Sequence, residues 1–584
     1  MRRFLARVLA VIGGLVVFAA LGAAGTAAYF WWTKPRVPAV AVLTIDLDRG
    51  LPEQRDNGPL SLLRRSGAMT FRQTVDTLDH AATDPRVKGL VAAIGAGKLG
   101  LAQTQELRDA IKRFRAAGKF AHAVSDSFGE FGPGNAGYYL AAAFDRIYLQ
   151  PTGALGLTGF YAEVPFARDA LDQWGIQPRI DRRATYKTAP NTVTETGFTP
   201  EQRENLQALI EDLTQQAVRD IAQDRRLDPA ALRALIDRGP FDAGQAKQAG
   251  LVDELAYRDQ ALDAARAKAG GAAKLQKLQR YAATADRPKA KGDAVALVYA
   301  VGAIMRGDGG QASPLGRSAL GAARIAKAIE DAAADKKVKA IVLRIDSPGG
   351  SYVASDTIRR AVERARAKGK PVVASMGNAA ASGGYYIALA AERIVAEPAT
   401  ITGSIGVFAG KLYTSGFWQK LGVNWDGVAG GTRADLWTQA RDYSADERAW
   451  LTQTLDRIYD EFVGRVAEAR GLTMERAREI AKGRVWTGLE AKQRGLVDEL
   501  GGLDAAIAAA RSLAGLKTEG PPVLREFPRQ RSVAGRLLDR VLGREDEGSG
   551  IEILAGLEPV EALARRLGVF EEPDVLAMPP LEIR

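Results

Sequence analysis

The 584-residue chain contains no cysteine and only two histidines, His80 and His122. The absence of cysteine excludes disulfides, thiol nucleophiles and cysteine-ligated metals. Because zinc usually requires several histidine or cysteine ligands, we expect no metal site. A Ser-His-Asp triad would have to use one of the two histidines. His80 lies in a charged helical pattern and His122 in a short apolar run typical of a strand, so we interpret both as surface or core residues.

The sequence has no strongly basic run either, although its net charge is +11. Lysine and arginine are spread along the chain and alternate with aspartate and glutamate. This pattern predicts a solvated surface with some attraction to anionic lipid, and no nucleic-acid partner. The chain is too long for one hydrophobic core, and its 46% hydrophobic and 26% charged residues indicate two or more globular domains.

An uncharged segment runs from Val8 to Thr33 and is long enough to cross the ~30 Å hydrocarbon core of a membrane. Three arginines precede it within residues 1–7, and an aromatic cluster closes it at residues 29–32. These features predict a single-pass anchor over residues 8–33, with residues 1–7 in the cytoplasm and the remainder outside it. The small residues AAGTAA (23–28) leave a cleaved signal peptide as the alternative, although the apolar core of a signal peptide is shorter.

The chain after this segment contains an internal repeat. NAGYYLAAAFDRIYLQP (135–151) reappears as SGGYYIALAAERIVAEP (382–398), and FDAGQAKQAGLVDEL reappears as WTGLEAKQRGLVDEL at nearly the same spacing. Each copy alternates short apolar runs with helical patterns, which predicts βαβ units and a largely parallel sheet. The expected fold class is therefore α/β, with two tandem repeats after one N-terminal transmembrane helix.

A polar segment with proline and glycine separates the two copies, and a proline-rich, weakly amphipathic tail follows the second. The sequence leaves two alternatives for this tail: it docks on the core of its own chain or on a neighbouring subunit. The expected segments are the cytoplasmic N-terminus (1–7), the anchor (8–33), the N-terminal repeat (38–280), the linker (281–292), the C-terminal repeat (293–515) and the tail (516–584).

The two copies differ at two positions that carry chemistry. Ser382 of the second copy stands where the first has Asn135, and Lys187 of the first copy has Ala434 as its counterpart. A nucleophile and a base divided between the copies would leave this pattern, and so would drift in a structural repeat. A serine hydroxyl needs a base to remove its proton. Lysine can serve only if its pKa falls from ~10.4 toward roughly 7–8, which burial between the copies would supply.

Glycines accompany the expected position of the serine. Ser382 stands at a predicted helix start and is followed by Gly383, while the turn RIDSPGGSY (344–352) carries Gly350 after a strand. Backbone N–H groups in such places can hold a developing oxyanion, each contributing about 2.7–4 kcal/mol. A helix N-cap serine and an ordinary β-turn are the alternatives.

The combination of YKTAP (186–190), RIDSPGGS (344–351), ASGGYY (381–386) and TGSIGV (402–407) resembles the signal peptide peptidase A family in its double-length, membrane-anchored form. The resemblance covers almost the whole chain. DSPGG stands where relatives commonly have NSPGG, which leaves the loop glycines unaffected. The family implies a Clp-protease/crotonase-like fold for each repeat and a serine endopeptidase with a Ser-Lys dyad.

Individual roles also follow from this resemblance. Ser382 is the expected nucleophile, and Lys187 is the expected general base and proton donor. Gly350 and Gly383 are expected to form the oxyanion hole, and Ser404 to orient the lysine. This chemistry needs no metal and no organic cofactor. Whether Lys187 serves the serine of its own chain or of a neighbouring chain stays open.

The family context implies a homotetramer in the bacterial inner membrane, held in the lipid by one N-terminal helix, with the catalytic domain on the periplasmic side. Its expected substrates are remnant signal peptides and other hydrophobic peptides. Two other functions remain as alternatives. A crotonase-type acyl-CoA enzyme would share the superfold, but would need neither the anchor nor serine and lysine together. A non-catalytic membrane scaffold would not need the dyad at all.

Overall fold

A computed structural model describes residues 37–54, 69–285, 292–309, 319–517, 520–528, 576–577 and 582–583. The predicted cytoplasmic N-terminus (1–7) and anchor (8–33) lie outside these ranges, as do residues 286–291 of the predicted linker (281–292). Among the helices within the ranges, none combines the length and the apolar character needed to span a bilayer.

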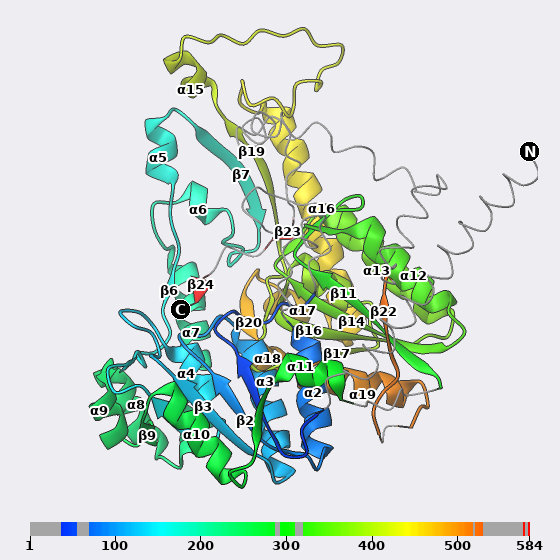
Figure 1. The fold of residues 1–584 in the computed structure, drawn as a ribbon. Coiled ribbons are helices and arrows are strands. Elements are labelled where there is room, and N and C mark those ends of the chain that lie inside the picture. Colours follow the sequence, from blue (N-terminus) through cyan, green and yellow to red (C-terminus); the bar gives the residue numbers. More distant parts are fainter. Residues whose placement is uncertain are drawn as a thin grey trace, which may run out of the picture.

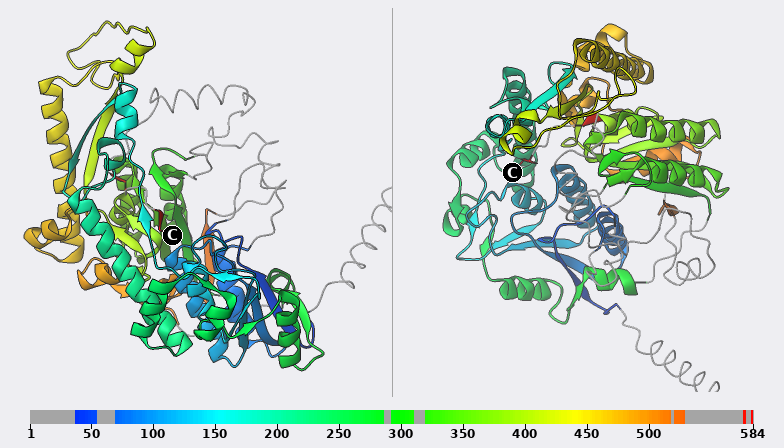
Figure 2. Two further views of the ribbon diagram at one scale, coloured as in Figure 1. Left: turned by 90° about the vertical axis from the view of Figure 1, so that its left-hand side faces the viewer. Right: turned by 90° about the horizontal axis from the view of Figure 1, so that it is seen from above.

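The described chain builds a mixed α/β fold with two parallel sheets that lie side by side (Figures 1 and 2). The first sheet is all parallel. Its strands, in spatial order, are β10 (Lys274–Lys277), β1 (Ala41–Asp46), β2 (Val87–Ala93), β3 (Phe120–Ser125), β4 (Arg146–Leu149) and β9 (Glu254–Leu255).

The second sheet repeats this order. Its corresponding strands are β22 (Leu524–Phe527), β11 (Ala294–Val301), β14 (Val338–Ser347), β16 (Val372–Ala381), β17 (Arg393–Ala396) and β21 (Glu499–Leu500). Beyond the bend in β16, β18 (Ile401–Gly403) pairs in parallel and β20 (Val485–Thr487) pairs antiparallel with β18. The common strand order is the structural form of the internal sequence repeat.

Helices cover both faces of each sheet, because the central strands are apolar on both sides. In the second sheet, Leu343 of β14 packs with the core beneath α12 and α13, whereas its neighbour Val342 packs against α19. The helices of the first repeat are α2 (Phe71–Thr83), α3 (Leu101–Ala116), α4 (Asn135–Ala141), α5 (Arg168–Gln173), α6 (Asn191–Thr194), α7 (Pro200–Arg225), α8 (Pro229–Arg238), α9 (Ala243–Gln248), α10 (Arg258–Lys268) and α11 (Leu278–Thr284). Those of the second are α12 (Ala322–Ala334), α13 (Tyr352–Ala367), α14 (Gly383–Ala388), α15 (Ser415–Lys420), α16 (Ala445–Arg470), α17 (Met474–Ile480), α18 (Gly488–Gln493) and α19 (Leu503–Leu513).

Several shorter strands join distant segments. β5 (Ala154–Leu155) pairs with β8 (Phe241–Asp242), and β15 (Gly349–Gly350) pairs in parallel with β12 (Ala303–Met305), which also pairs with β13 (Ala319–Gly321). The most consequential pair joins the two repeats. β7 (Gln177–Arg183) of the first runs antiparallel to β19 (Val407–Tyr413) of the second, with α16 alongside (Figure 1). The register pairs Arg183 with Val407, which brings the chain after β7 to the chain before β19.

The segment after residue 515 belongs partly to the second repeat. β22 pairs in parallel with β11 and fills the edge position that β10 fills in the first sheet. The expected end of the second repeat at residue 515 is therefore too early, because β22 follows it. The proline-rich sequence around β22 does not have a strand pattern, and the strand is recognised by its pairing with β11. Further on, β23 (Leu576–Ala577) pairs antiparallel with β15, and β24 (Glu582–Ile583) with β6 (Ala162–Glu163). The tail thus docks on its own chain.

A buried cluster of charged side chains connects the two repeats. Arg344 of β14 is fully buried and its Nη2 lies 2.9 Å from Glu53 Oε1 and 2.6 Å from Glu106 Oε1. The second oxygen of Glu106 accepts a 3.0 Å hydrogen bond from the N–H of Leu503, at the start of α19. A cation of the second repeat is thereby neutralised by two carboxylates of the first.

Candidate active site

Ser382 lies between the end of β16 and the start of α14. Its backbone has φ of +54° and ψ of −114°, a conformation that costs a non-glycine residue of order 1–3 kcal/mol. The strain is held by two backbone hydrogen bonds: Ser382 N donates to Gly403 O at 2.7 Å, and Tyr386 N donates to Ser382 O at 2.8 Å. The hydroxyl makes no capping bond to the helix, so Ser382 is not an N-cap of the ordinary kind.

Lys187 follows β7, in a turn where its own N–H donates to Ala184 O at 3.1 Å. Two glycines make room for its backbone and side chain. A Cβ at Gly483 would lie 2.4 Å from Lys187 N, and a Cβ at Gly406 would lie 3.2 Å from Lys187 Cδ. Sequence reasoning missed both glycines as determinants of the site, although Gly406 stands in the TGSIGV motif.

The structure brings three of the five expected site residues into direct contact within one chain. Lys187 Nζ lies 2.7 Å from Ser382 Oγ, 2.9 Å from Ser404 O and 3.1 Å from Ser404 Oγ. All three residues are 0% exposed. The question of whether the contact is within one chain or between chains is answered for this structure: it forms within one.

Burial holds the pKa of the Lys187 ammonium far below its ordinary value, and no carboxylate in the described part of the chain forms an ion pair with it. In its neutral form, which burial favours, this amine has two N–H donors and one lone pair. The two Ser404 oxygens accept the N–H groups. The lone pair is left for the hydroxyl of Ser382, so the arrangement can remove the proton of the serine.

The two expected oxyanion residues also meet beside the serine. A Cβ at Gly383 would lie 3.1 Å from Gly350 N and 2.7 Å from Ser355 Oγ, so only glycine fits between them. Gly350 has φ of +151°, and a Cβ there would lie 2.2 Å from Ile304 O. The SPGG turn is thus a strand edge built for close backbone approach, and not an ordinary β-turn. Ser355 was not foreseen; its side chain comes from α13.

The equivalent place in the first repeat has different chemistry. Asn135 donates through Nδ2 to Gly159 O at 2.8 Å, and its Oδ1 accepts from Thr158 N at 3.0 Å and Gly159 N at 3.1 Å. Through these three bonds the amide holds the 158–159 loop. Ala434, the counterpart of Lys187, lies in an exposed loop.

Of the two histidines, His122 is buried in β3, where its ring lies 4.8 Å from that of Phe120 and 5.5 Å from that of Tyr148. Burial lowers the pKa of His122 to about 4. His80 lies in α2, with its ring 5.9 Å from that of Tyr281. Both therefore belong to the packing of the first repeat, and the side-chain nitrogen that contacts Ser382 Oγ is Lys187 Nζ.

Comparison with known proteins identifies the family of the chain. A model of peptidase family S49 matches residues 131–271 and 364–517, one segment in each repeat. "Serine protease SPPA, chloroplastic" of Arabidopsis thaliana is 30% identical over 518 residues, which cover 86% of this chain and 73% of that protein. "Protease 4" of Salmonella typhi is 35% identical over 459 residues, which cover 76% of this chain and 72% of that protein.

A mutant of ClpP1 from Listeria monocytogenes aligns in space with 36% of this chain and 94% of its own, at 18% identity and a TM-score of 0.22. The evidence for the family comes from the sequence relatives, since this chain covers more than two thirds of the length of each of them. Both repeats match the family model, and Ser382 and Lys187 lie in contact between them. The chain therefore belongs to peptidase family S49 and is a serine endopeptidase.

Proposed function

We propose that Ser382 and Lys187 form a catalytic dyad that hydrolyses hydrophobic peptides, including remnant signal peptides, at the outer face of the bacterial inner membrane. The observation that carries the proposal is the 2.7 Å contact between Lys187 Nζ and Ser382 Oγ, with both side chains fully buried. The uncharged segment 8–33 supports membrane anchoring, and the family context supports a homotetramer.

The reaction begins when the lone pair of Lys187 takes the Ser382 proton and the alkoxide oxygen attacks the peptide carbonyl. The resulting oxyanion is held by the backbone N–H groups of Gly350 and Gly383. Protonated Lys187 then gives its proton to the leaving amine, which departs and leaves an acyl ester on Ser382. Lys187 next takes a proton from water, the hydroxide attacks the ester, and the proton returns to Ser382. Ser404 fixes the nitrogen of Lys187 next to the serine oxygen, so that proton transfer can occur in both directions.

The mode of peptide binding is suggested by the chain's own tail. The segment Leu576–Ala577 adds antiparallel to Gly349–Gly350, and β23 also contacts β19. A free strand edge that accepts an extended segment is a recurrent way to bind peptides, because backbone hydrogen bonds supply affinity without sequence dependence. We therefore expect substrate to add to β15 in the same extended form.

Covalent labelling tests the nucleophile directly. An organophosphonate should modify Ser382, as mapped by peptide mass spectrometry, and should stop hydrolysis of a fluorogenic Leu/Ala-rich peptide in proportion to the labelled fraction. The wild-type protein should leave acyl-CoA thioesters intact. Loss of activity with the label on another residue would refute the dyad, and thioester turnover that survives Ser382→Ala would favour the crotonase-type alternative.

Removal of the tail segments should relieve competition at the same strand edge. A chain shortened to end after residue 570 loses β23 and β24, and we expect KM for a short apolar peptide to fall by roughly two- to tenfold, with kcat little changed. The measurement is a Michaelis–Menten comparison of the two forms in detergent. Addition of the free peptide 571–584 to the shortened form should inhibit competitively; noncompetitive inhibition would show that the tail acts elsewhere.

A further inference from the structure

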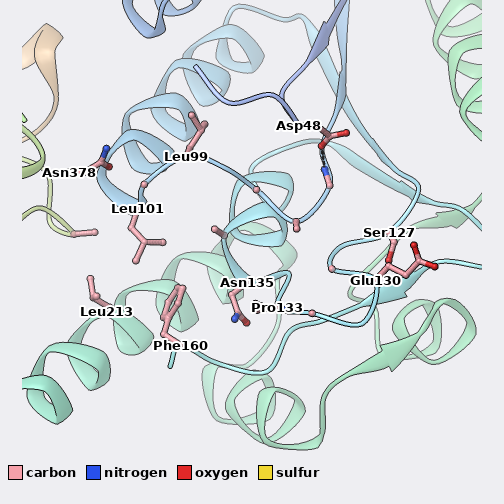
Figure 3. A pocket seen from close by; sticks show the side chains of 18 of the residues that line it. Asp48, Leu99, Leu101, Ser127, Glu130, Pro133, Asn135, Phe160, Leu213 and Asn378 are labelled. Atoms are coloured by element: carbon pink, nitrogen blue, oxygen red, sulfur yellow. Dashed lines mark hydrogen bonds between the residues drawn. The ribbon is translucent and has the colours of Figure 1, made fainter. Parts of the chain in front are cut away.

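The first repeat retains a cavity at the position that corresponds to the serine site of the second. The cavity has a volume of about 750 Å³, within the usual range for a ligand site, and Asn135 lies in its wall (Figure 3). Leu99 and Gly100 precede α3 as Gly350 and Ser351 precede α13, so the same strand–turn–helix frame surrounds both places. The frame is conserved within the chain, whereas the nucleophile is not.

The inner wall of this cavity is apolar. Three side chains point toward one another in Figure 3: Leu101 of α3, Leu213 of α7, and Phe160. Ile401 of β18, in the second repeat, also lines this wall. The loop 126–133 forms the opposite side and borders a second cavity of about 910 Å³. At its tip Phe131 is fully exposed, with φ of +53°. An exposed aromatic at a strained position beside an apolar cavity marks a surface suited to an apolar ligand.

The rim of the cavity carries negative charge. Asp48, Asp126 and Glu130 line it and are exposed, and none of them forms an ion pair within the described ranges of the chain. Asp48 accepts a short hydrogen bond from the N–H of Gly95, which fixes its carboxylate at the edge (Figure 3). The chain as a whole has a net charge of +11, so this rim is a local exception. It complements a cation, while the wall behind it complements aliphatic side chains.

The cavity is also close to the catalytic strand. Asn378 lines it and lies in β16, four positions before Ser382; at about 3.3 Å per residue the separation along the strand is roughly 13 Å. Its amide is fixed by Gln103 N, which donates to Oδ1 at 3.2 Å, and its Nδ2 donates to Asp346 Oδ2 at 3.3 Å. This separation is within the span of an extended peptide of about five residues.

We propose that this cavity is a non-catalytic binding site for a second segment of the substrate, an extended apolar peptide that carries lysine or arginine. The inference rests on the proposed function, because it extends the substrate site of the same enzyme. The first repeat holds the basic, apolar segment without cleaving it, since Asn135 offers no nucleophile and its amide is bonded to the 158–159 loop. The preference for a basic residue arises from the three rim carboxylates.

Binding to the full-length Ser382→Ala protein in detergent tests this site apart from hydrolysis. The probes are fluorescein-labelled Leu/Ala peptides of roughly 16 residues with two lysines at one end, and the same peptides with glutamine in place of lysine. Asp126→Lys combined with Glu130→Lys should weaken binding of the lysine peptide roughly tenfold and of the glutamine peptide less than twofold. Ala96→Trp, which fills the cavity from an exposed position, should weaken both peptides.

Glu468→Lys, an exposed charge reversal on α16 that changes the net charge by half as much, is the control and should leave both affinities unchanged. Thermal unfolding verifies that the variants are folded. Unchanged affinity of both peptides for the double variant and for Ala96→Trp overturns the proposal. Equal weakening by Glu468→Lys also overturns it, because the effect would then be one of net charge. If the peptides bind as expected but the wild-type protein hydrolyses none of them, the binding site is supported and the proposed function is refuted.

Discussion

Lys187→Met is expected to lower kcat/KM for an apolar peptide by roughly 10³- to 10⁶-fold, because it removes the base that takes the serine proton. Lys187 Nζ lies 2.7 Å from Ser382 Oγ, and methionine has no lone pair of comparable basicity. The methionine side chain has a similar length and suits a fully buried position. The loss should therefore appear in kcat without collapse of the fold.

The pH profile separates a catalytic role from a structural one. Since burial lowers the pKa of Lys187, the wild-type amine stays neutral well below the usual range of lysine, and kcat/KM should fall only as pH drops through that lowered value. The residual activity of Lys187→Met should not show this fall in kcat/KM at low pH. Stability has the corresponding sign: the unfolded chain binds a proton that the folded chain excludes, so wild-type stability relative to Lys187→Met should rise with pH, by up to about 1.4 kcal/mol per unit.

Lys411→Met is the matched control for Lys187→Met. Lys411 is also a buried lysine; its Nζ donates to Leu436 O at 2.9 Å and lies 4.2 Å from the centre of the Tyr443 ring. Loss of this amine should change kcat/KM by less than about threefold, as expected for a side chain that does not contact the reacting atoms. Comparable losses in the two variants, or a Lys187→Met protein with wild-type hydrolysis, would contradict the dyad.

Arg344→Met is expected to lower the free energy of unfolding by about 3–5 kcal/mol, the largest effect on stability that we foresee. The guanidinium is fully buried, and its removal leaves the carboxylates of Glu53 and Glu106 without their shared cation. Burial already raises the pKa of Glu106, and loss of the neighbouring cation raises it further. The deficit should therefore widen as pH rises above the raised pKa that Glu106 has in the wild-type protein, because the folded variant retains a proton that the folded wild type releases.

Urea denaturation of the two proteins at several pH values measures this effect. Adding Glu106→Gln to Arg344→Met should recover part of the loss, since the neutral amide can still accept the hydrogen bond from Leu503 N. Arg364→Met is the control: Arg364 pairs with Glu330 at 2.6 Å on the exposed side of α13, and its loss should cost no more than about 1 kcal/mol. Equal costs for Arg344→Met and Arg364→Met would mean that the buried cluster does not join the repeats.

Much of the chemistry could be predicted from the sequence alone. The two copies of the repeat, the α/β class, the candidate serine and lysine and the SPGG turn are all local patterns, and the predicted family is confirmed by relatives that span both repeats. Residue types and short-range spacing are sufficient for such predictions, because a nucleophile, a base or a glycine turn each depends on a few neighbouring residues. The membrane anchor over residues 8–33 stays a prediction of the same kind.

What only the tertiary structure decided is how distant parts of the chain meet. The pairing of β7 with β19 brings Lys187 to Ser382, and Gly406 and Gly483 make room for the lysine. The lowered pKa of that amine is a consequence of burial, which no local pattern encodes. β22 and β23 were likewise hidden in the tail, because a short strand is recognisable only by its partner. Long-range pairing and desolvation depend on contacts between residues far apart in sequence, and that is why the chain's folding was needed to turn two candidate residues into one site.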